Sequence, residues 1–255
     1  MRNRLLNLFT MNARKGAGIV AEGNVIYVYD FIAGSESEAQ WFGGISAEAF
    51  VKALNAMEGS VQVRLDSPGG DVFGARAMAQ AIREYAGEVT CQIDGLAASA
   101  ATYVATAGDR VVAAPGAFMM IHRAWTFAIG NCNDLVAQAG VLEKIDGTIA
   151  ASYAAKAGGS EEDWLALMDA ETWFTAAEAL ERGLIDEALS EEGAKASVKR
   201  AAWNLAAFEH PPVEDLEIEP EAPAPEPAPP AAESTDDEIQ ARRRRLAVDL
   251  LTPAA

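Results

Sequence analysis

Residues 61–70 read VQVRLDSPGG, a run of alternating apolar and polar residues that ends in a proline and two glycines. Alternation with a period of two is typical of a strand that is buried on one face. A segment with helical spacing follows as far as residues 86–87, and a second β-branched run occupies residues 89–93. The order strand, helix, strand predicts a parallel pair joined by a crossover, which is the basic unit of an α/β domain.

The same alternation of strands and helices continues on both sides of this unit. The further elements that the pattern predicts are strands at 25–29, 110–113 and 118–122, and helices at 46–57, at about 133–156 and after the caps Ser160 and Thr175. Sheets of this kind bind ligands at the carboxyl ends of their strands. The glycine turn at 67–70, Ser99 and His122 all follow predicted strands, so we expect them at one edge of the sheet.

Residues 95–101 read GLAASAA, and small residues of this kind predict a closely packed, buried helix around Ser99. The chain has two histidines, His122 and His210, and His210 lies in a proline-rich segment. A serine hydroxyl is a poor nucleophile at neutral pH unless a base takes its proton. Ser99 and His122 therefore form the candidate catalytic pair. Each of them alone also fits a purely structural role, as a serine in an alanine-rich helix or a histidine of the core.

The turn at residues 67–70 reads SPGG. Glycines at the end of a strand can point backbone N–H groups at an oxyanion, although the same residues also make an ordinary tight turn. The continuation GGDVFG at 69–74 fits neither phosphate-binding glycine pattern and lacks the necessary lysine. The chain also lacks the Gly-x-Ser-x-Gly pattern of the α/β-hydrolases.

The net charge of −18 is concentrated towards the C-terminus, because residues 201–240 hold eleven acidic residues, no Lys or Arg, and eight of the eleven prolines. Such a segment buries too little apolar surface to offset its ordering entropy. We therefore expect the chain to consist of four parts. They are a flexible N-terminal segment at 1–22, a folded domain at 23–200, an acidic proline-rich disordered linker at 201–235 and a short charged segment at 236–255.

Several classes of partner and site are not expected. The two cysteines, Cys91 and Cys132, have no zinc-ligand or disulfide-framework spacing, which suits a reducing cytoplasm, and Cys91 fits a core strand. Residues 1–10 lack the features of a signal peptide, and no run is long enough for a membrane helix. Four arginines at 242–245 fit an acidic partner or a short charged helix, and we expect no nucleic-acid partner for so acidic a chain.

Several patterns taken in order carry a family resemblance. They are DSPGG at 66–70, the segment from Cys91 to Ser99, MIH at 120–122, Glu178-Ala179 and GLID at 183–186. Over about residues 60–190 the chain resembles the Clp protease proteolytic subunit family of serine peptidases. The acidic tail and ETWF at 171–174 favour its phage and prophage members, the head maturation proteases. The resemblance implies the α/β superhelix of repeated strand-strand-helix units that this family shares with the crotonases.

The resemblance also implies roles for individual residues. Ser99 matches the nucleophile and His122 the general base, while the backbone N–H groups of Gly70 and Ala100 match the oxyanion hole. The third member of the triad falls on Glu171, with Asp169 as the alternative. The segments that would clamp a substrate peptide as an added strand contain Gly69, Asp71, Val72, Arg123 and Trp125. No cofactor and no metal are expected.

For the assembly, the resemblance implies that the helix at 133–156 is the handle by which two seven-membered rings stack into a chamber. The expected function is a serine endopeptidase that acts in such a chamber, with protein or peptide substrates. An ATP-driven unfoldase, or capsid and scaffold precursors during phage head maturation, would be its partners. Two other functions remain open, a crotonase-like acyl-CoA enzyme and a non-catalytic assembly protein of the same fold.

Overall fold

The computed structural model describes residue 12 and residues 18–190, 203–205 and 207–212. The chain divides into two compact units, Met1–Pro212 and Val213–Ala255, and the described residues all belong to the first. Most of the predicted linker at 201–235, and all of the predicted charged segment at 236–255, lie outside the described residues.

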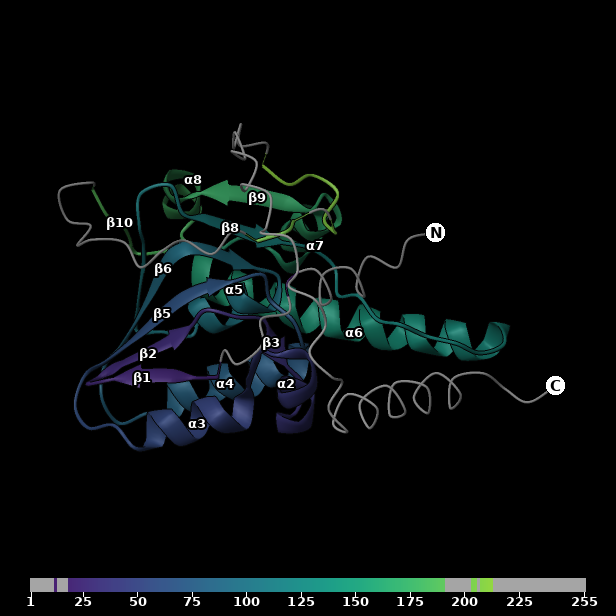
Figure 1. Ribbon diagram of the computed structural model, residues 1–255. Helices are drawn as coiled ribbons and strands as arrows, with labels where there is room; N and C mark the ends of the chain where they lie inside the picture. Colours follow the sequence, from purple (N-terminus) through teal and green to yellow (C-terminus); the bar gives the residue numbers. More distant parts are fainter. Residues whose placement is uncertain (1–11, 13–17, 191–202, 206, 213–255) are drawn as a thin grey trace, which may run out of the picture. The chain divides into compact units, whose positions relative to one another are not determined.

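The first unit is built on one large twisted sheet (Figure 1). Its strands, in pairing order, are β1 (Val20–Glu22), β2 (Val25–Val28), β5 (Val61–Ser67), β6 (Val89–Ala98), β7 (Arg110–Ala113) and β10 (Glu187–Ala188). Neighbours along this path are parallel except for β1 and β2. Two more strands, β8 (Phe118–Ile121) and β9 (Thr172–Thr175), form an antiparallel pair attached to β6 through β8. The α/β fold predicted from residues 61–93 is thereby confirmed.

Strand β6 changes its partner halfway along its length. Residues 90–93 pair with β7, and residues 96–98 pair with β8. Its other edge follows β5 throughout, with a shift of register between Leu65 and Ser67. The carboxyl end of β6 therefore emerges between β5 and β8, and this is where Ser99 follows.

Helices cover the sheet, and two of them begin at capping residues that the sequence predicts. Their bounds are α2 (Glu36–Phe42), α3 (Ala47–Asn55), α4 (Val72–Glu84), α5 (Ala100–Ala105), α6 (Cys132–Ala157), α7 (Glu161–Asp169) and α8 (Ala176–Glu181). Ser160 and Thr175 make the predicted capping boxes of α7 and α8. A short two-stranded sheet, β3 (Ile32–Ala33) and β4 (Ile45–Ser46), flanks α2. In Figure 1, α3 and α4 lie side by side along one face of the sheet, and α6 extends well beyond it.

The core follows from the alternation of the strands. In β5 the apolar residues Val61, Val63 and Leu65 are buried, and the intervening Gln62 and Arg64 are half-buried. Removing a fully buried large side chain from such a core typically costs about 2–5 kcal/mol. A second, smaller apolar cluster lies on the outer face of β6 and β8. Its buried members are Leu96, Ala98, Met120, Ala207 and Phe208.

The helix predicted around Ser99 is wrong in its first half. Gly95 to Ala98 belong to β6, and the helix begins only at Ala100. Alanine is the best helix former, but helix propensity is a weak preference that tertiary packing overrides, as it does here. Ala97 is fully buried and pairs on both sides, with Ser67 of β5 and Met119 of β8.

Two predicted segment boundaries also differ from the structure. The N-terminal segment predicted to be flexible at 1–22 includes β1, which pairs with β2. Within the linker predicted from residue 201, Ala207 and Phe208 are buried and pack on the domain. The prediction of disorder was based on the average acidity of residues 201–240, which gives no weight to the few apolar side chains at the start of this segment.

Within the described residues, no helix is long and apolar enough to cross a membrane. The same residues contain no group of three or more His, Cys, Asp or Glu side chains placed to hold a metal ion.

Candidate active site

Ser99 occupies a strained turn between β6 and α5. Its φ of 53° and ψ of −126° lie in a region that non-glycine residues rarely adopt, and such strain is concentrated at functional sites. Its N–H donates to the carbonyl oxygen of Met120 at 2.8 Å, so the backbone of β8 fixes the turn. The Ser99 hydroxyl lies 2.7 Å from Nε2 of His122. The structure therefore brings together the two residues of the predicted catalytic pair.

His122 directly follows β8 and is 9% exposed. The Trp125 ring stands edge-on to it at 4.4 Å between ring centroids. Burial lowers the pKa of His122 from 6.5 to about 4. The imidazole is therefore neutral at pH 7, which is the form that can accept a proton from serine. When Nε2 accepts, Nδ1 carries the ring proton, and Nδ1 is buried with no hydrogen-bond partner among the described residues.

The glycine turn packs directly against the serine turn. A Cβ on Gly69 (φ 93°) would lie 2.6 Å from the Ala98 carbonyl oxygen, and one on Gly70 (φ 144°) would lie 2.1 Å from the Ile32 carbonyl oxygen. Both contacts are too short for any side chain. Two backbone bonds of 2.8 Å between β3 and this turn hold it in place, from the Ile32 N–H to Gly69 and from the Asp71 N–H to Ile32.

The two predicted oxyanion donors lie on the segments that meet at Ser99. Ala100 is the first residue of α5, and the first N–H groups of a helix have no partner inside it. Gly70 lies next to Gly69, whose added Cβ would also come within 3.0 Å of the Ala100 nitrogen. The two segments that carry the predicted donors therefore meet beside Ser99, and the oxyanion role itself stays a prediction.

The predicted third member of the triad, Glu171, makes no hydrogen bond to His122 among the described residues. The Glu171 carboxylate is buried and accepts the backbone N–H groups of Glu209, at 2.6 and 2.8 Å, and of His210, at 2.6 Å. The indole N–H of Trp173 lies 3.4 Å from the same group. Glu171, with φ of 46°, is the other non-glycine residue of positive φ among the described residues.

Asp169, the alternative, is also engaged elsewhere. Both of its carboxylate oxygens pair with the Arg123 guanidinium, at 2.7 and 2.8 Å. This pair lowers the pKa of Asp169. Arg123 also reaches Asp146 of α6 at 3.4 Å, and Asp146 accepts the Ala124 N–H at 2.8 Å. Burial raises the pKa of Asp146. These ion pairs fix the chain directly after His122.

Most of the side chains predicted to hold substrate contact other residues of the domain in this structure. Arg123 is bound by Asp169 and Asp146, and the Trp125 ring packs on His122. Asp71 caps α4 by accepting the Gly74 N–H at 2.6 Å. Val72 lines a cavity beside Ser99. Of this set, Val72 is the side chain that faces the space next to the nucleophile.

The cavity beside Ser99 and His122 has a volume of about 20 Å³, close to the space of one water molecule. Its remaining walls are Ala75, Ala100, Tyr103, Ala124, Ile149 and Tyr153. The Thr102 hydroxyl links the site to α6, since it lies 2.5 Å from both the Ser99 carbonyl oxygen and the Tyr153 hydroxyl. Sequence reasoning missed these aromatic walls. The four-residue spacing of Ile149 and Tyr153, which puts them on one face of α6, is the signal that could have indicated them.

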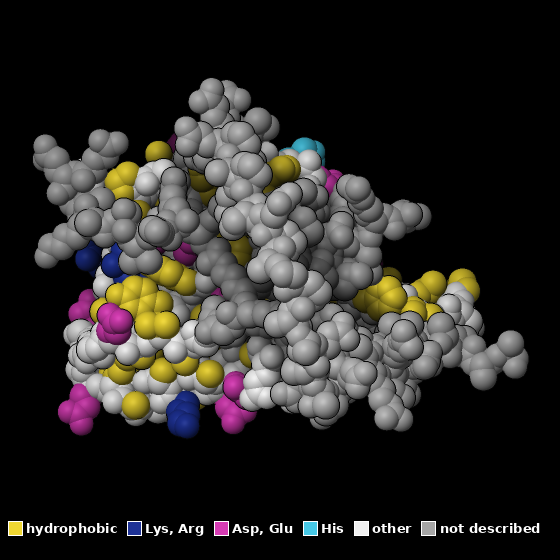
Figure 2. All heavy atoms as spheres, viewed as in Figure 1, with side chains coloured by type: hydrophobic (Ala, Val, Ile, Leu, Met, Phe, Trp, Pro, Cys, Tyr) yellow, Lys and Arg dark blue, Asp and Glu magenta, His cyan; other side chains and the backbone are white. Residues whose placement is uncertain are grey.

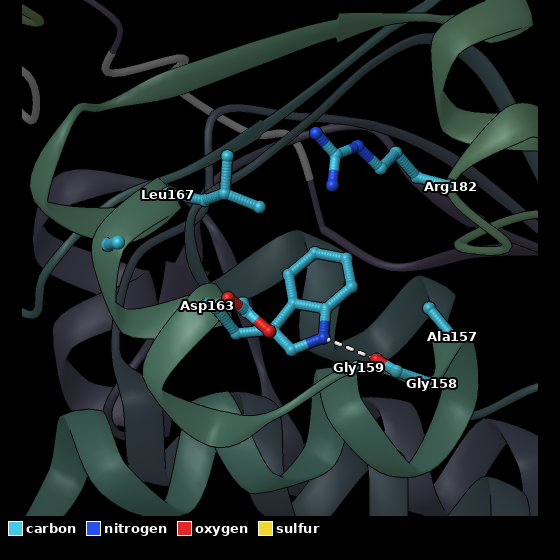
Figure 3. A pocket seen from close by; sticks show the side chains of 8 residues that line it. Ala157, Gly158, Gly159, Asp163, Leu167 and Arg182 are labelled. Carbon is cyan, nitrogen blue, oxygen red and sulfur yellow. Dashed lines mark hydrogen bonds between the residues drawn. The ribbon is translucent and has the colours of Figure 1, made fainter.

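Larger cavities lie elsewhere and lack a catalytic pair. One of about 410 Å³ is shown in Figure 3, where Asp163, Leu167 and Arg182 face it from α7 and the end of α8. The Trp164 indole, which also lines this cavity, donates to the Gly158 carbonyl oxygen at 2.7 Å. A second, of about 520 Å³, is lined by residues of α7, β9 and α8. Neither contains Ser99 or His122, so the candidate chemistry remains at the serine.

Comparisons with known proteins identify relatives of this chain. The Clp protease family profile matches residues 33–192. The ATP-dependent Clp protease proteolytic subunit 2 of Cutibacterium acnes is 28% identical over 159 residues, which cover 62% of this chain and 75% of that protein. The corresponding subunit of Deinococcus radiodurans is 28% identical over 160 residues, 62% of this chain and 78% of its own.

A solved structure of a ClpP1 mutant from Listeria monocytogenes superposes with a TM-score of 0.56 at 18% identity, covering 67% of this chain and 94% of the other. At this identity the likeness shows the fold alone. The profile match spans the glycine turn, Ser99 and His122, and it covers more than half of the chain. The chain therefore belongs to the Clp protease family.

Proposed function

We propose that this protein is a serine endopeptidase. Ser99 attacks the carbonyl carbon of the scissile peptide bond while His122 takes the hydroxyl proton. His122 then gives that proton to the leaving amine as the bond breaks, and water releases the acyl group from Ser99 by the same route. The backbone N–H groups of Gly70 and Ala100 stabilise the oxyanion. The observation that carries the proposal is the 2.7 Å contact between Ser99 and a neutral, buried His122.

The proposed setting is a closed chamber of stacked rings, seven-membered by resemblance, in the cytoplasm. Support comes from an apolar surface on α6 and the loop before it, where several large side chains are exposed. They are Phe127, Ile129, Leu135, Val136 and Val141. Figure 2 shows hydrophobic side chains gathered at the protruding end of α6. Exposed apolar patches of this kind mark interaction sites.

The proposed substrates are scaffold or capsid precursors of a phage head. The composition of residues 201–240, acidic and rich in proline, supports this finer assignment. The relatives from Cutibacterium acnes and Deinococcus radiodurans are named subunits of ATP-dependent proteases, so an ATP-driven unfoldase is the competing partner. To distinguish the two possibilities, the assembled protein is incubated with a tagged capsid precursor, once alone and once with an ATP-driven unfoldase.

The reaction is tested with a fluorophosphonate probe, which labels serines activated as nucleophiles. We expect stoichiometric labelling of the wild type at Ser99, none in Ser99→Ala and very little in His122→Ala. Ser37→Ala, which removes an exposed hydroxyl on α2, is the matched control and should label like the wild type. Absence of labelling in an assembled oligomer would leave a non-catalytic assembly protein as the better assignment.

A further inference from the structure

Residues 203–205 and 207–210, here called the strap, lie against the candidate active site although they are far from it in sequence (yellow-green beside β9 in Figure 1). Ala207 and Phe208 are 2% and 5% exposed. They cover the apolar face formed by Leu96, Ala98 and Met120. The strap therefore belongs to the packed part of the domain.

Polar contacts hold the strap at its first residues. The Trp203 indole donates to the buried Asp66 carboxylate at 2.9 Å. Asn204 exchanges two hydrogen bonds with Asn12, of 3.0 and 2.7 Å. Both partners are remote in sequence from the strap, so these bonds fix one particular path across the domain.

Phe208 makes a direct contact with the candidate base. Its ring stands edge-on to His122 at 5.6 Å between centroids, and it lies at the same distance from Trp125 and Trp173. Of these rings, Phe208 and Trp125 pack directly against the imidazole. Burial is also the cause of the low pKa of His122, and the strap contributes part of that burial.

The two residues after Phe208 donate their backbone N–H groups to the Glu171 carboxylate, as described above. In the ladder between β8 and β9, Ile121 pairs with Thr172. His122 follows β8 directly and Glu171 precedes β9 directly, so both residues lie at the same end of this antiparallel pair. The strap thus binds the carboxylate of Glu171 at the end of the strand pair where His122 lies, and Nδ1 of His122 has no hydrogen-bond partner among the described residues.

We propose that the strap is an autoinhibitory segment of this protease. While it is bound, its backbone N–H groups hold Glu171 and the Nδ1–H of His122 has no acceptor. When it is released, Glu171 accepts that N–H and orients the imidazole towards Ser99. This inference rests on the proposed peptidase function of Ser99.

Release also has an electrostatic consequence. Charged groups on the segments around His122 pair elsewhere while the strap is bound. They are Asp66 with Trp203, Asp146 and Asp169 with Arg123, and Glu171 with the strap. Exposure of the ring and a new carboxylate partner both favour the imidazolium ion. The pKa of His122 should therefore rise from about 4 to its ordinary value of 6.5 or above.

The test uses the untagged full chain with His210→Ala as the background, because His122 is then the single histidine. This substitution keeps the His210 backbone N–H and removes an exposed side chain, so it also serves as the matched control. Phe208→Ala and Glu209→Pro are added separately. The first removes the contact with His122, and the second removes one N–H donor to Glu171.

We expect either change to raise the rate of fluorophosphonate labelling at Ser99 about 10-fold or more, since an orienting carboxylate can contribute as much as about 10⁴ in a serine triad. Adding Glu171→Gln should abolish the gain. By NMR, the pKa of His122 should rise in both strap variants. An unchanged pKa and labelling rate in a folded strap variant would overturn the inference, as would a gain that survives Glu171→Gln.

The two proposals fail in different ways. If no variant is labelled but the pKa of His122 still rises, the peptidase assignment fails while the strap contact stands. If the background protein is labelled and the strap variants label no faster, the autoinhibitory role fails. Should Phe208→Ala not fold, as judged by thermal melting, Glu209→Pro decides, because it keeps every buried side chain of the strap.

Discussion

The two sides of the candidate site are held by different kinds of structure. On the nucleophile side, Ser99 and the glycine turn are fixed by backbone contacts with neighbouring strands. On the carboxylate side, Glu171 is held by residues that lie 38 and 39 positions further along the chain. The first side is rigid because the fold itself requires it. The second side depends on a segment that can leave without breaking the sheet, which makes it the natural place for control.

The largest effect is expected from crowding the rigid side. Gly70→Ala should reduce labelling of Ser99 by at least about 100-fold, because the added Cβ collides with the Ile32 carbonyl and displaces an oxyanion donor. Gly140→Ala in α6 is the matched control, since nothing lies within 4 Å of its added Cβ. It should keep full labelling and stabilise the helix by about 1 kcal/mol. Wild-type labelling of Gly70→Ala would show that this turn is not part of the site.

The arrangement of the nucleophile side could be predicted from the sequence, whereas that of the carboxylate side could not. Ser99, His122 and the glycine turn follow strands, and the order of strands and helices predicts where strand ends meet. The contact between Glu171 and the strap cannot be predicted in this way. It depends on two backbone N–H groups in a segment whose average composition indicates disorder, and backbone donors leave no signature in the side chains. The full length of β6 could not be predicted for a similar reason, since alanine packs as well in a buried strand as in a buried helix.

The next effect concerns His122, which joins the two sides. Its folded pKa of about 4 lies below its unfolded value near 6.5, so between these pH values the unfolded chain binds a proton that the folded chain does not. The free energy of unfolding should therefore rise with pH across this window, by about 3 kcal/mol at most, and gain nothing from His122 above it. Urea titrations from pH 4 to 8 measure the slope. His122→Gln should flatten it and His210→Ala should keep it, whereas equal slopes in both variants would contradict a buried neutral imidazole.

A smaller effect should come from the strain at the nucleophile. With φ of 53° and ψ of −126°, Ser99 has a backbone conformation that glycine adopts without a steric penalty. Both Ser99→Ala and Ser99→Gly remove the hydroxyl and its bond to His122, so they differ mainly in this strain. We expect Ser99→Gly to be the more stable of the two by about 1–2 kcal/mol in urea denaturation, despite the greater freedom of glycine in the unfolded chain. If Ser99→Ala is equally stable, the turn stores no strain.

The smallest effect is expected on the solvent-facing part of the carboxylate side. The Asp169 side chain is 62% exposed in its pair with Arg123, and exposed ion pairs contribute only about 0.2–1 kcal/mol to stability. Asp169→Ala should therefore lower the free energy of unfolding by less than about 1 kcal/mol. This loss should be smaller still in high salt, which screens the pair. Asp146→Ala is the informative contrast. It removes a buried acceptor from the Ala124 N–H and should cost about 1–3 kcal/mol. Chemical denaturation of both variants at low and high salt ranks them. If Asp169→Ala proved the more damaging and also slowed labelling of Ser99, the exposed carboxylate would be what positions the chain after His122, and control of the site would not reside in the strap alone.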